Sequence, residues 1–118
     1  MTKTKNEQLE TLIQALKTLA IQKDVSLWKR MAVELEKATR ARREVNVYKL
    51  DLFAREGEIV IVPGKVLGSG ALSKKITVAA LSFSDSAKDK ILANKGEAIT
   101  IAQLMEKNPQ GSKVRIMG

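Results

Sequence analysis

The sequence predicts an α/β fold, and three observations lead to that prediction. The first third of the 118 residues contains no proline or glycine and carries two apolar stripes at helical spacing. The rest alternates short β-branched runs with short helical segments, which is typical of layered α/β proteins. With 44% hydrophobic residues, a chain of this length can bury its own core. We therefore expect one domain over residues 1–118, with a helical pair at 1–37 and a strand–helix core at 38–118.

The first third of the chain predicts two helices. Thr4 and Glu7 have the spacing of a capping box, and leucines at helical spacing follow, so the first helix is expected over residues 5–22. Asp24 and Ser26 are candidate caps of the second helix. Its apolar face is formed by Leu27, Trp28, Met31 and Leu35.

Short strands and helices are expected from residue 45 onward. Val45–Val47 predicts a short strand, and residues 48–54 predict a short helix that Asn46 can cap. Ile59–Val62 is an uninterrupted β-branched run, as expected of a strand buried on both faces, and Pro63-Gly64 is expected to end it. The later elements are a strand at 76–81, a helix capped by Ser84 or Asp85 and ended by Gly96, a strand stub at 98–99, a helix capped by Thr100, and a strand at 114–116.

The charge balance favours a polyanionic partner. Lys and Arg number 21 against 13 Asp and Glu, a net charge of +8, and the alternative is a basic protein that is merely soluble. Cysteine and histidine are absent, which excludes disulfides, thiolate nucleophiles and most zinc sites and removes the usual general base. No apolar segment reaches the ~20 residues of a membrane helix, and the N-terminus lacks a signal-peptide core. We expect a cytoplasmic protein.

Residues 62–75, VPGKVLGSGALSKK, carry three glycines and three lysines but no acid, a composition suited to binding phosphate. The spacing matches neither a Walker loop nor a dinucleotide fingerprint. No Gly-Lys-Ser/Thr follows Gly68 or Gly70, and Ser73 stands where the fingerprint needs glycine. A strand, not a helix, is expected after the loop, so no helix N-terminus would face a pyrophosphate. The phosphate of a polymer is therefore the favoured ligand.

Catalytic pairs have little support in the sequence. The candidates are Glu56 with Glu58, Asp85 with Asp89, and Ser69 or Ser73 beside lysines. No histidine or cysteine supports the carboxylates, and a Ser–Lys dyad needs a buried, deprotonated lysine that nothing in the sequence indicates. We predict a protein that is not an enzyme, without metal, cofactor or small-molecule substrate.

An arginine cluster follows the predicted helical pair. The stretch ATRARREVN carries Arg40, Arg42 and Arg43 against one acid, Glu44. Two interpretations remain open: a solvated connector, or a cluster whose guanidinium groups bridge phosphates or stack on unpaired bases. Neighbouring like charges repel one another unless an anion is present, which favours the second.

Aromatic residues make up only 3% of the chain. Proteins that read single strands normally stack bases on exposed aromatic side chains, and here Trp28 and Phe53 are expected in the core. The sequence therefore favours recognition of the shape and backbone of folded RNA.

Three segments together resemble a known family: EVNVYKLDLFA, IVIVPGKVLGSGALSKKITVAALSFS and NPQGSKVRIMG. They are similar to large-subunit ribosomal protein eighteen-e, a family of archaea and eukaryotes related to bacterial large-subunit protein fifteen. The resemblance implies irregular β-β-α superhelical turns behind the N-terminal helical pair. It also implies a non-catalytic role against ribosomal RNA of the large subunit, with neighbouring ribosomal proteins as further partners. Two departures from the family pattern are Ala38 or Thr39 in place of a proline, and Gln110 where a basic residue is common.

We predict that the arginine cluster and the glycine-rich loop converge on one surface that binds RNA. The predicted RNA-binding residues are Arg40, Arg42, Arg43, Gly64, Lys65, Gly68, Gly70, Lys74 and Lys75, with Lys37, Lys49 and Arg115 as additional contacts. Two other functions remain open. A nucleic-acid-binding regulator outside the ribosome would dimerise on short defined sites. A nucleotide-dependent enzyme would take up ATP or GTP.

Overall fold

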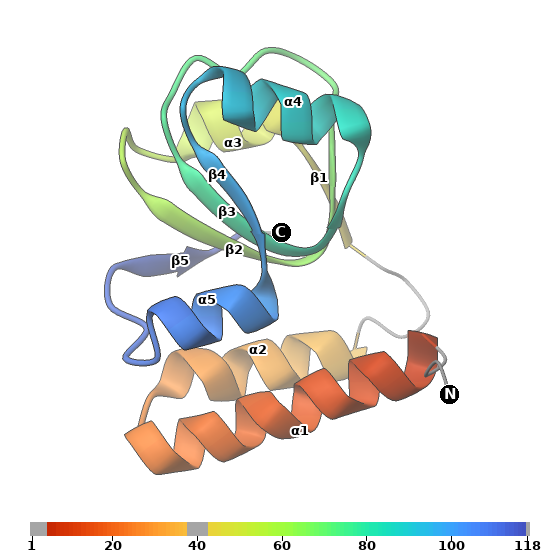
Figure 1. Ribbon diagram of the computed structural model, residues 1–118, viewed down its shortest axis with the longest axis vertical. Helices are drawn as coiled ribbons and strands as arrows, with labels where there is room; N and C mark the ends of the chain where they lie inside the picture. Colours follow the sequence, from red (N-terminus) through yellow and green to blue (C-terminus); the bar gives the residue numbers. More distant parts are fainter. Residues whose placement is uncertain (1–4, 38–42, 118) are drawn as a thin grey trace.

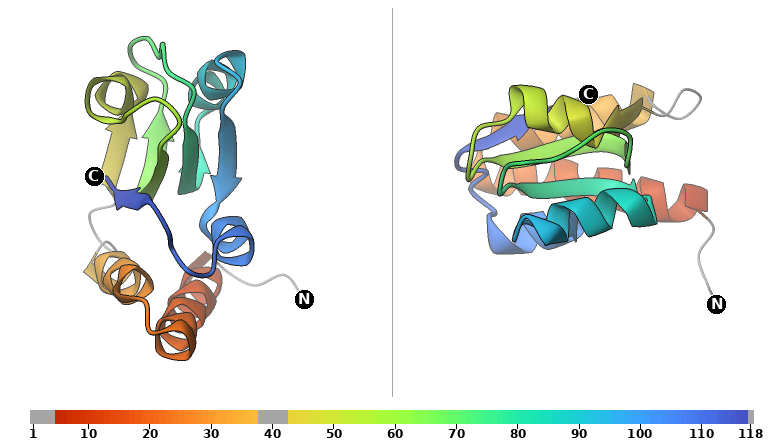
Figure 2. Two further views of the ribbon diagram at one scale, coloured as in Figure 1. Left: turned by 90° about the vertical axis from the view of Figure 1, so that its left-hand side faces the viewer. Right: turned by 90° about the horizontal axis from the view of Figure 1, so that it is seen from above.

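Five parallel strands form one sheet in the part of the chain that the computed structural model describes, which is the backbone of residues 5–37 and 43–117 and the side chains of residues 8–37 and 44–117. The left view of Figure 2 shows the order β1-β2-β3-β4 across the sheet, with β5 also paired to β2. The strands are β1 (Arg43–Asn46), β2 (Ile59–Leu67), β3 (Thr77–Phe83), β4 (Glu97–Thr100) and β5 (Val114–Ile116). The α/β class predicted from the alternating pattern is confirmed.

Helices cover both faces of the sheet (Figure 1). On one face lie α3 (Val47–Phe53) and α4 (Asp85–Ala93), and on the other α1 (Lys5–Lys23), α2 (Ser26–Lys37) and α5 (Ile101–Lys107). Each face has its own hydrophobic cluster, so the predicted helical pair packs onto the sheet beside α5. Among the described residues, no helix combines the length and apolarity needed to cross a membrane.

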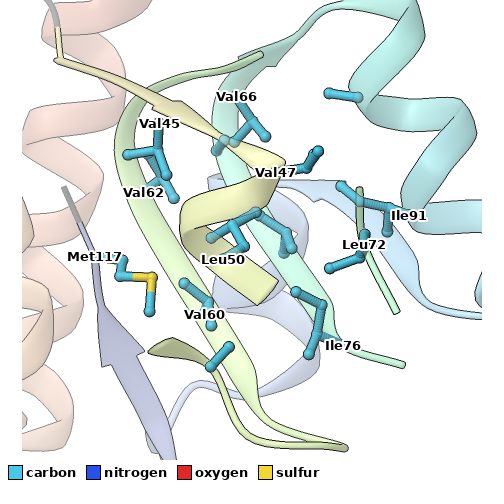
Figure 3. Packing of buried hydrophobic residues seen from close by; sticks show 14 residues of the cluster. Val45, Val47, Leu50, Val60, Val62, Val66, Leu72, Ile76, Ile91 and Met117 are labelled. Atoms are coloured by element: carbon cyan, nitrogen blue, oxygen red, sulfur yellow. The ribbon is translucent and has the colours of Figure 1, made fainter. Parts of the chain in front are cut away.

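The central strand β2 contributes to both clusters. Val60 and Val62 point into the cluster with α3 and α4 (Figure 3). Ile61 belongs to the opposite cluster, and all three side chains are fully buried. The predicted strand buried on both faces is thus confirmed. Its predicted end at Pro63-Gly64 is wrong, because β2 continues to Leu67. The pairing of β2 with β3 shifts register between Val62 and Lys65, and such an irregularity accommodates a proline inside a strand.

Two strands share one edge of β2, end to end. β5 pairs with Ile59–Ile61, and β1 pairs with the residues from Gly64 to Leu67. The opposite edge of the sheet is β4, which pairs with β3. The C-terminal strand and the start of the strand–helix core are therefore neighbours, although about 70 residues separate them along the chain.

Several helix ends follow the local sequence. α1 begins at Lys5 as predicted and ends one residue later than expected. The Ser84 hydroxyl accepts a hydrogen bond from the Ala87 amide, and Thr100 forms a reciprocal capping box with Gln103. α2 begins at Ser26, and the predicted cap Asp24 lies in the preceding turn with φ of 53°.

The junction between β1 and α3 differs from the prediction. The strand ends at Asn46, and Val47, expected in the strand, is the first helical residue. Asn46 occupies the N-cap position, but its side chain does not cap α3; its Oδ1 instead accepts a hydrogen bond from the Ser69 amide at 3.2 Å. The Asn46 side chain thus bonds to an amide 23 residues away and not to an amide in the first turn of α3.

The two aromatic side chains expected in the core have different environments. Trp28 is fully buried, and its Nε1 donates to the Pro109 carbonyl at 2.8 Å. The prediction for Phe53 is wrong, since its side chain is 54% exposed. The buried face of α3 consists of Val47 and Leu50, and Phe53 ends the helix outside that stripe.

Candidate nucleic-acid interface

The glycine-rich segment forms a crossover between two parallel strands. Residues 68–76 leave the end of β2 and return to the start of β3, because parallel neighbours cannot be joined by a tight hairpin. The segment passes between α3 and α4, as the left view of Figure 2 shows. Residues 62–67 of the predicted loop belong instead to β2.

Side-chain and backbone groups around α3 hold one side of this crossover. The Tyr48 amide donates to the Ser69 carbonyl at 3.1 Å. Asp51 Oδ1 accepts from the amide and the hydroxyl of Ser73, at 2.9 and 2.8 Å. These two bonds, with the charge of Lys74, lower the pKa of Asp51, so the carboxylate stays ionised at neutral pH and keeps its acceptor role.

Helix α4 holds the other side. The Lys90 ammonium donates to the carbonyls of Gly68 and Gly70, and Asn94 Nδ2 donates to the Leu72 carbonyl at 2.7 Å. Sequence analysis missed these two residues. A signal was present: they follow Ala87 by three and seven positions, on the stripe that also carries the buried Ile91.

The crossover glycines are required by protein neighbours. A Cβ on Gly68 would lie 2.3 Å from Ser86 Oγ and 2.9 Å from the Ala87 amide nitrogen. Gly70 has φ of +90°, and a Cβ there would lie 2.4 Å from Tyr48 Cβ. Both glycines therefore allow close packing against α4 and α3. Gly64 is buried within β2, opposite Arg43.

The two lysines at the end of the crossover differ in role. The half-buried Lys74 donates its ammonium to the carbonyls of Asp51 and Ala54, the latter at 2.8 Å, at the C-terminal end of α3. Its charge thus stabilises the helix end. Lys75 has an exposed side chain, and its amide donates to Glu56.

Lys74→Met is expected to lower the free energy of unfolding by about 1–3 kcal/mol, because two partly buried carbonyls lose a charged donor. Lys75→Met is the matched control, and its effect should stay within about 0.5 kcal/mol. Urea denaturation of both variants measures the difference. Equal midpoints would show that the Lys74 ammonium does not support α3.

The remaining predicted cations lie on different parts of the surface. Arg115 pairs its Nε with Glu58 at 3.1 Å and donates from Nη1 to the Phe53 carbonyl at 3.1 Å, so it also supports the end of α3. The other three are exposed: Lys37 at the end of α2, Lys49 on α3 and Lys65 on β2.

The predicted convergence of cluster and loop has a mixed outcome in the described residues. The backbone of Arg43 lies opposite Gly64, and Glu44 lies opposite Lys65, so the start of β1 and the middle of β2 are side by side. The crossover from Gly68 to Lys75 lies instead against α3 and α4. Arg40 and Arg42 lie outside the described residues, as does the side chain of Arg43.

Exposed apolar side chains on α3 were also missed. Tyr48, Leu52 and Phe53 are 54%, 68% and 54% exposed. Two of the four aromatic residues of the chain are thus accessible, beside the exposed Lys49. The low aromatic content hid this, because composition does not report which side of a short helix faces outward.

The fold and its charge define a class: a basic α/β protein with a five-stranded parallel sheet and, among its described residues, no cluster of side chains that could hold a metal ion. The chain belongs to the family described as ribosomal protein 60S L18 and 50S L18e, whose model matches residues 1–118. The resemblance seen in its sequence segments is confirmed.

Archaeal relatives match nearly end to end. The large ribosomal subunit protein eL18 of Methanospirillum hungatei is 49% identical over 112 residues, covering 95% of this chain and 93% of that protein. The eL18 protein of Halobacterium salinarum is 46% identical, covering 99% of each chain. That of Archaeoglobus fulgidus is 45% identical, covering 95% of this chain and 96% of its own.

Proposed function

We propose that this protein is a structural, non-catalytic constituent of the large subunit of the cytoplasmic ribosome, where it binds and stabilises folded ribosomal RNA. The observation that carries the proposal is the family match across residues 1–118, with relatives named as large ribosomal subunit proteins over almost their whole length. A net charge of +8 suits a polyanionic partner. Neighbouring ribosomal proteins are the second expected class of partner.

The geometry favours the edge of the sheet at β1 as an RNA contact. Four cations occur between residues 37 and 43, and the last of them, Arg43, begins β1 opposite Gly64. Lys65 is exposed one position further along β2. Guanidinium groups can form bidentate hydrogen bonds with phosphate, and the Lys65 ammonium adds positive charge without base preference.

The crossover supports a structural role better than a nucleotide site. Its glycine carbonyls accept from Lys90, and Lys74 donates to the backbone of α3. These cations are already bonded to the protein, so they do not form the open cradle that a bound nucleotide needs.

Replacing Arg40, Arg42 and Arg43 together by Ala is expected to weaken binding to large-subunit ribosomal RNA. The log–log slope of affinity against salt should fall by about 2–3 units, because each lost phosphate contact removes about 0.7–0.9. Filter binding between ~50 and ~200 mM salt measures this slope.

A control variant matches the lost charge on the other side of the molecule: Lys88→Ala, Lys95→Asn and Lys107→Ala. All three lysines are exposed on or near α4 and α5, which flank β4 at the opposite sheet edge. Asn replaces Lys95 because φ there is 63°. Equal slopes for the arginine variant and the parent would remove the cluster from the site. A parent chain without affinity for ribosomal RNA would overturn the proposed function.

A further inference from the structure

Two grooves run along the two sides of β5. One, of about 540 Å³, lies between β5 and the turn after α3, and the other, of about 600 Å³, lies between β5 and the start of α2. They share Val114 and Arg115, so they meet across the strand. The first is lined by residues 55–59, Lys113, Val114 and Arg115, and the second by Ser26, Leu27, Arg30, Val114, Arg115 and Ile116.

The residues that line the grooves include more basic than acidic side chains. Arg30, Arg55 and Lys113 have exposed side chains, and none forms an ion pair with any residue that the structure describes. The two carboxylates of the lining are already bonded. Glu58 accepts from Arg115 and from the Arg55 amide, and Glu56 accepts from the Lys75 amide. Only Glu58 is bonded to a cation, because the partner of Glu56 is a neutral backbone amide. The combined lining therefore carries four cations against two carboxylates, a net positive charge that favours an anionic ligand.

The grooves lie on the same edge of β2 as the start of β1. Arg115 is opposite Val60 and Arg43 is opposite Gly64 on the same edge of β2. These two positions are four residues apart along β2, a distance of about 13 Å. α2 follows the same edge: its first turn lines the second groove, and its last residue, Lys37, leads toward β1. In Figure 1, β5 lies near the start of α2, and β1 lies near its end.

We propose that the β5 grooves bind the sugar-phosphate backbone of RNA, on the sheet edge that continues to the start of β1. This inference rests on the proposed function and names three residues that the sequence did not indicate: Arg30, Arg55 and Lys113. A track of separated cations suits a polymer with regularly spaced phosphates. Forked guanidinium groups at both grooves suit phosphate oxygens, which accept two parallel hydrogen bonds.

The test is a variant that removes the three unpaired cations: Arg30→Ala, Arg55→Ala and Lys113→Asn. Asn is chosen because φ at residue 113 is 58°. Arg115 is left unchanged, since it supports α3. The salt slope for ribosomal RNA should fall by about 2–3 units relative to the Lys88, Lys95 and Lys107 variant, which removes the same charge. Because the three groove side chains have no partner among the described residues, the groove variant should unfold at the parent's urea midpoint. The lysine variant loses the exposed ion pair of Lys107 with Glu97, so its free energy of unfolding should fall by at most about 1 kcal/mol.

A second measurement maps the RNA directly. The chain contains no cysteine, so Lys113→Cys, Arg42→Cys and Lys88→Cys each create a unique attachment point for an iron–EDTA cleavage reagent. Probes at positions 113 and 42 are expected to cut the same or adjacent ribosomal RNA helices. The probe at position 88 is expected to cut elsewhere or not at all.

Three results would overturn the inference without touching the proposed function. The groove variant could bind RNA like the lysine control while the arginine variant still loses affinity. The probe at position 113 could leave the RNA uncut while the probe at position 42 cuts it. The groove variant could keep RNA affinity and lose binding to poly-glutamate, which would indicate an acidic protein as the ligand of β5. By contrast, a parent that fails to bind ribosomal RNA would end the proposed function itself.

Discussion

Val60→Asp is expected to unfold the protein under native conditions. Val60 is fully buried near the start of β2, with Val78 beside it on β3 and Arg115 beside it on β5. The carboxylate would enter the cluster between the sheet and α3, where no partner compensates its lost hydration. We expect a loss of more than about 4 kcal/mol, comparable with the whole stability of a small domain.

Circular dichroism and urea denaturation measure this loss. Ser82→Asp is the matched control, because it places the same charge on the neighbouring strand β3 at an exposed position opposite Lys65. The control should unfold at nearly the parent's urea midpoint. If Val60→Asp also kept that midpoint, β2 would not be the core strand that organises both layers.

Gly70→Ala is expected to destabilise the fold more than Gly57→Ala. Both glycines have positive φ, +90° and +80°, so both substitutions meet a left-handed penalty of about 1–2 kcal/mol. Only at Gly70 would the new Cβ clash, 2.4 Å from Tyr48 Cβ, whereas nothing lies within 4 Å at Gly57. Overpacking of this kind adds about 1–3 kcal/mol.

The comparison decides why the crossover is rich in glycine. If the glycines serve packing, the urea midpoint falls further for Gly70→Ala, and the folded variant keeps its affinity for ribosomal RNA. If Gly70 serves close approach of RNA, the two variants share one midpoint and Gly70→Ala alone loses affinity. The geometry at Tyr48 leads us to expect the first result.

The crossover and the sheet edge therefore have different proposed roles: the first holds the fold together, and the second contacts RNA. The lysines and glycines between residues 68 and 75 join β2 to β3 and bind α3 and α4 to each other. The proposed RNA contacts move to the edge made by β1, β5 and α2, where cations remain exposed. These contacts support a structural role for a loop whose composition suits phosphate.

Local features were predictable because neighbours along the chain decide them. The capping box of Thr100 and Gln103 spans three residues, and the β-branched run at Ile59–Val62 needs burial on both faces in any layered fold. The α/β class follows from such patterns, and the family membership was readable from the motif segments.

The sequence by itself determined the α/β class, the doubly buried strand, most helix ends and the positive charge. Only the tertiary structure decided which cations are hydrogen-bonded to the protein itself, because their partners are distant in sequence. Lys90 and Gly68 are 22 residues apart, and Arg115 and Phe53 are 62 residues apart. It also placed β5 and β1 on one edge of β2 and left Phe53 outside the core. Periodicity reports which face of an element is apolar, but the group that meets a polar side chain depends on how the elements pack.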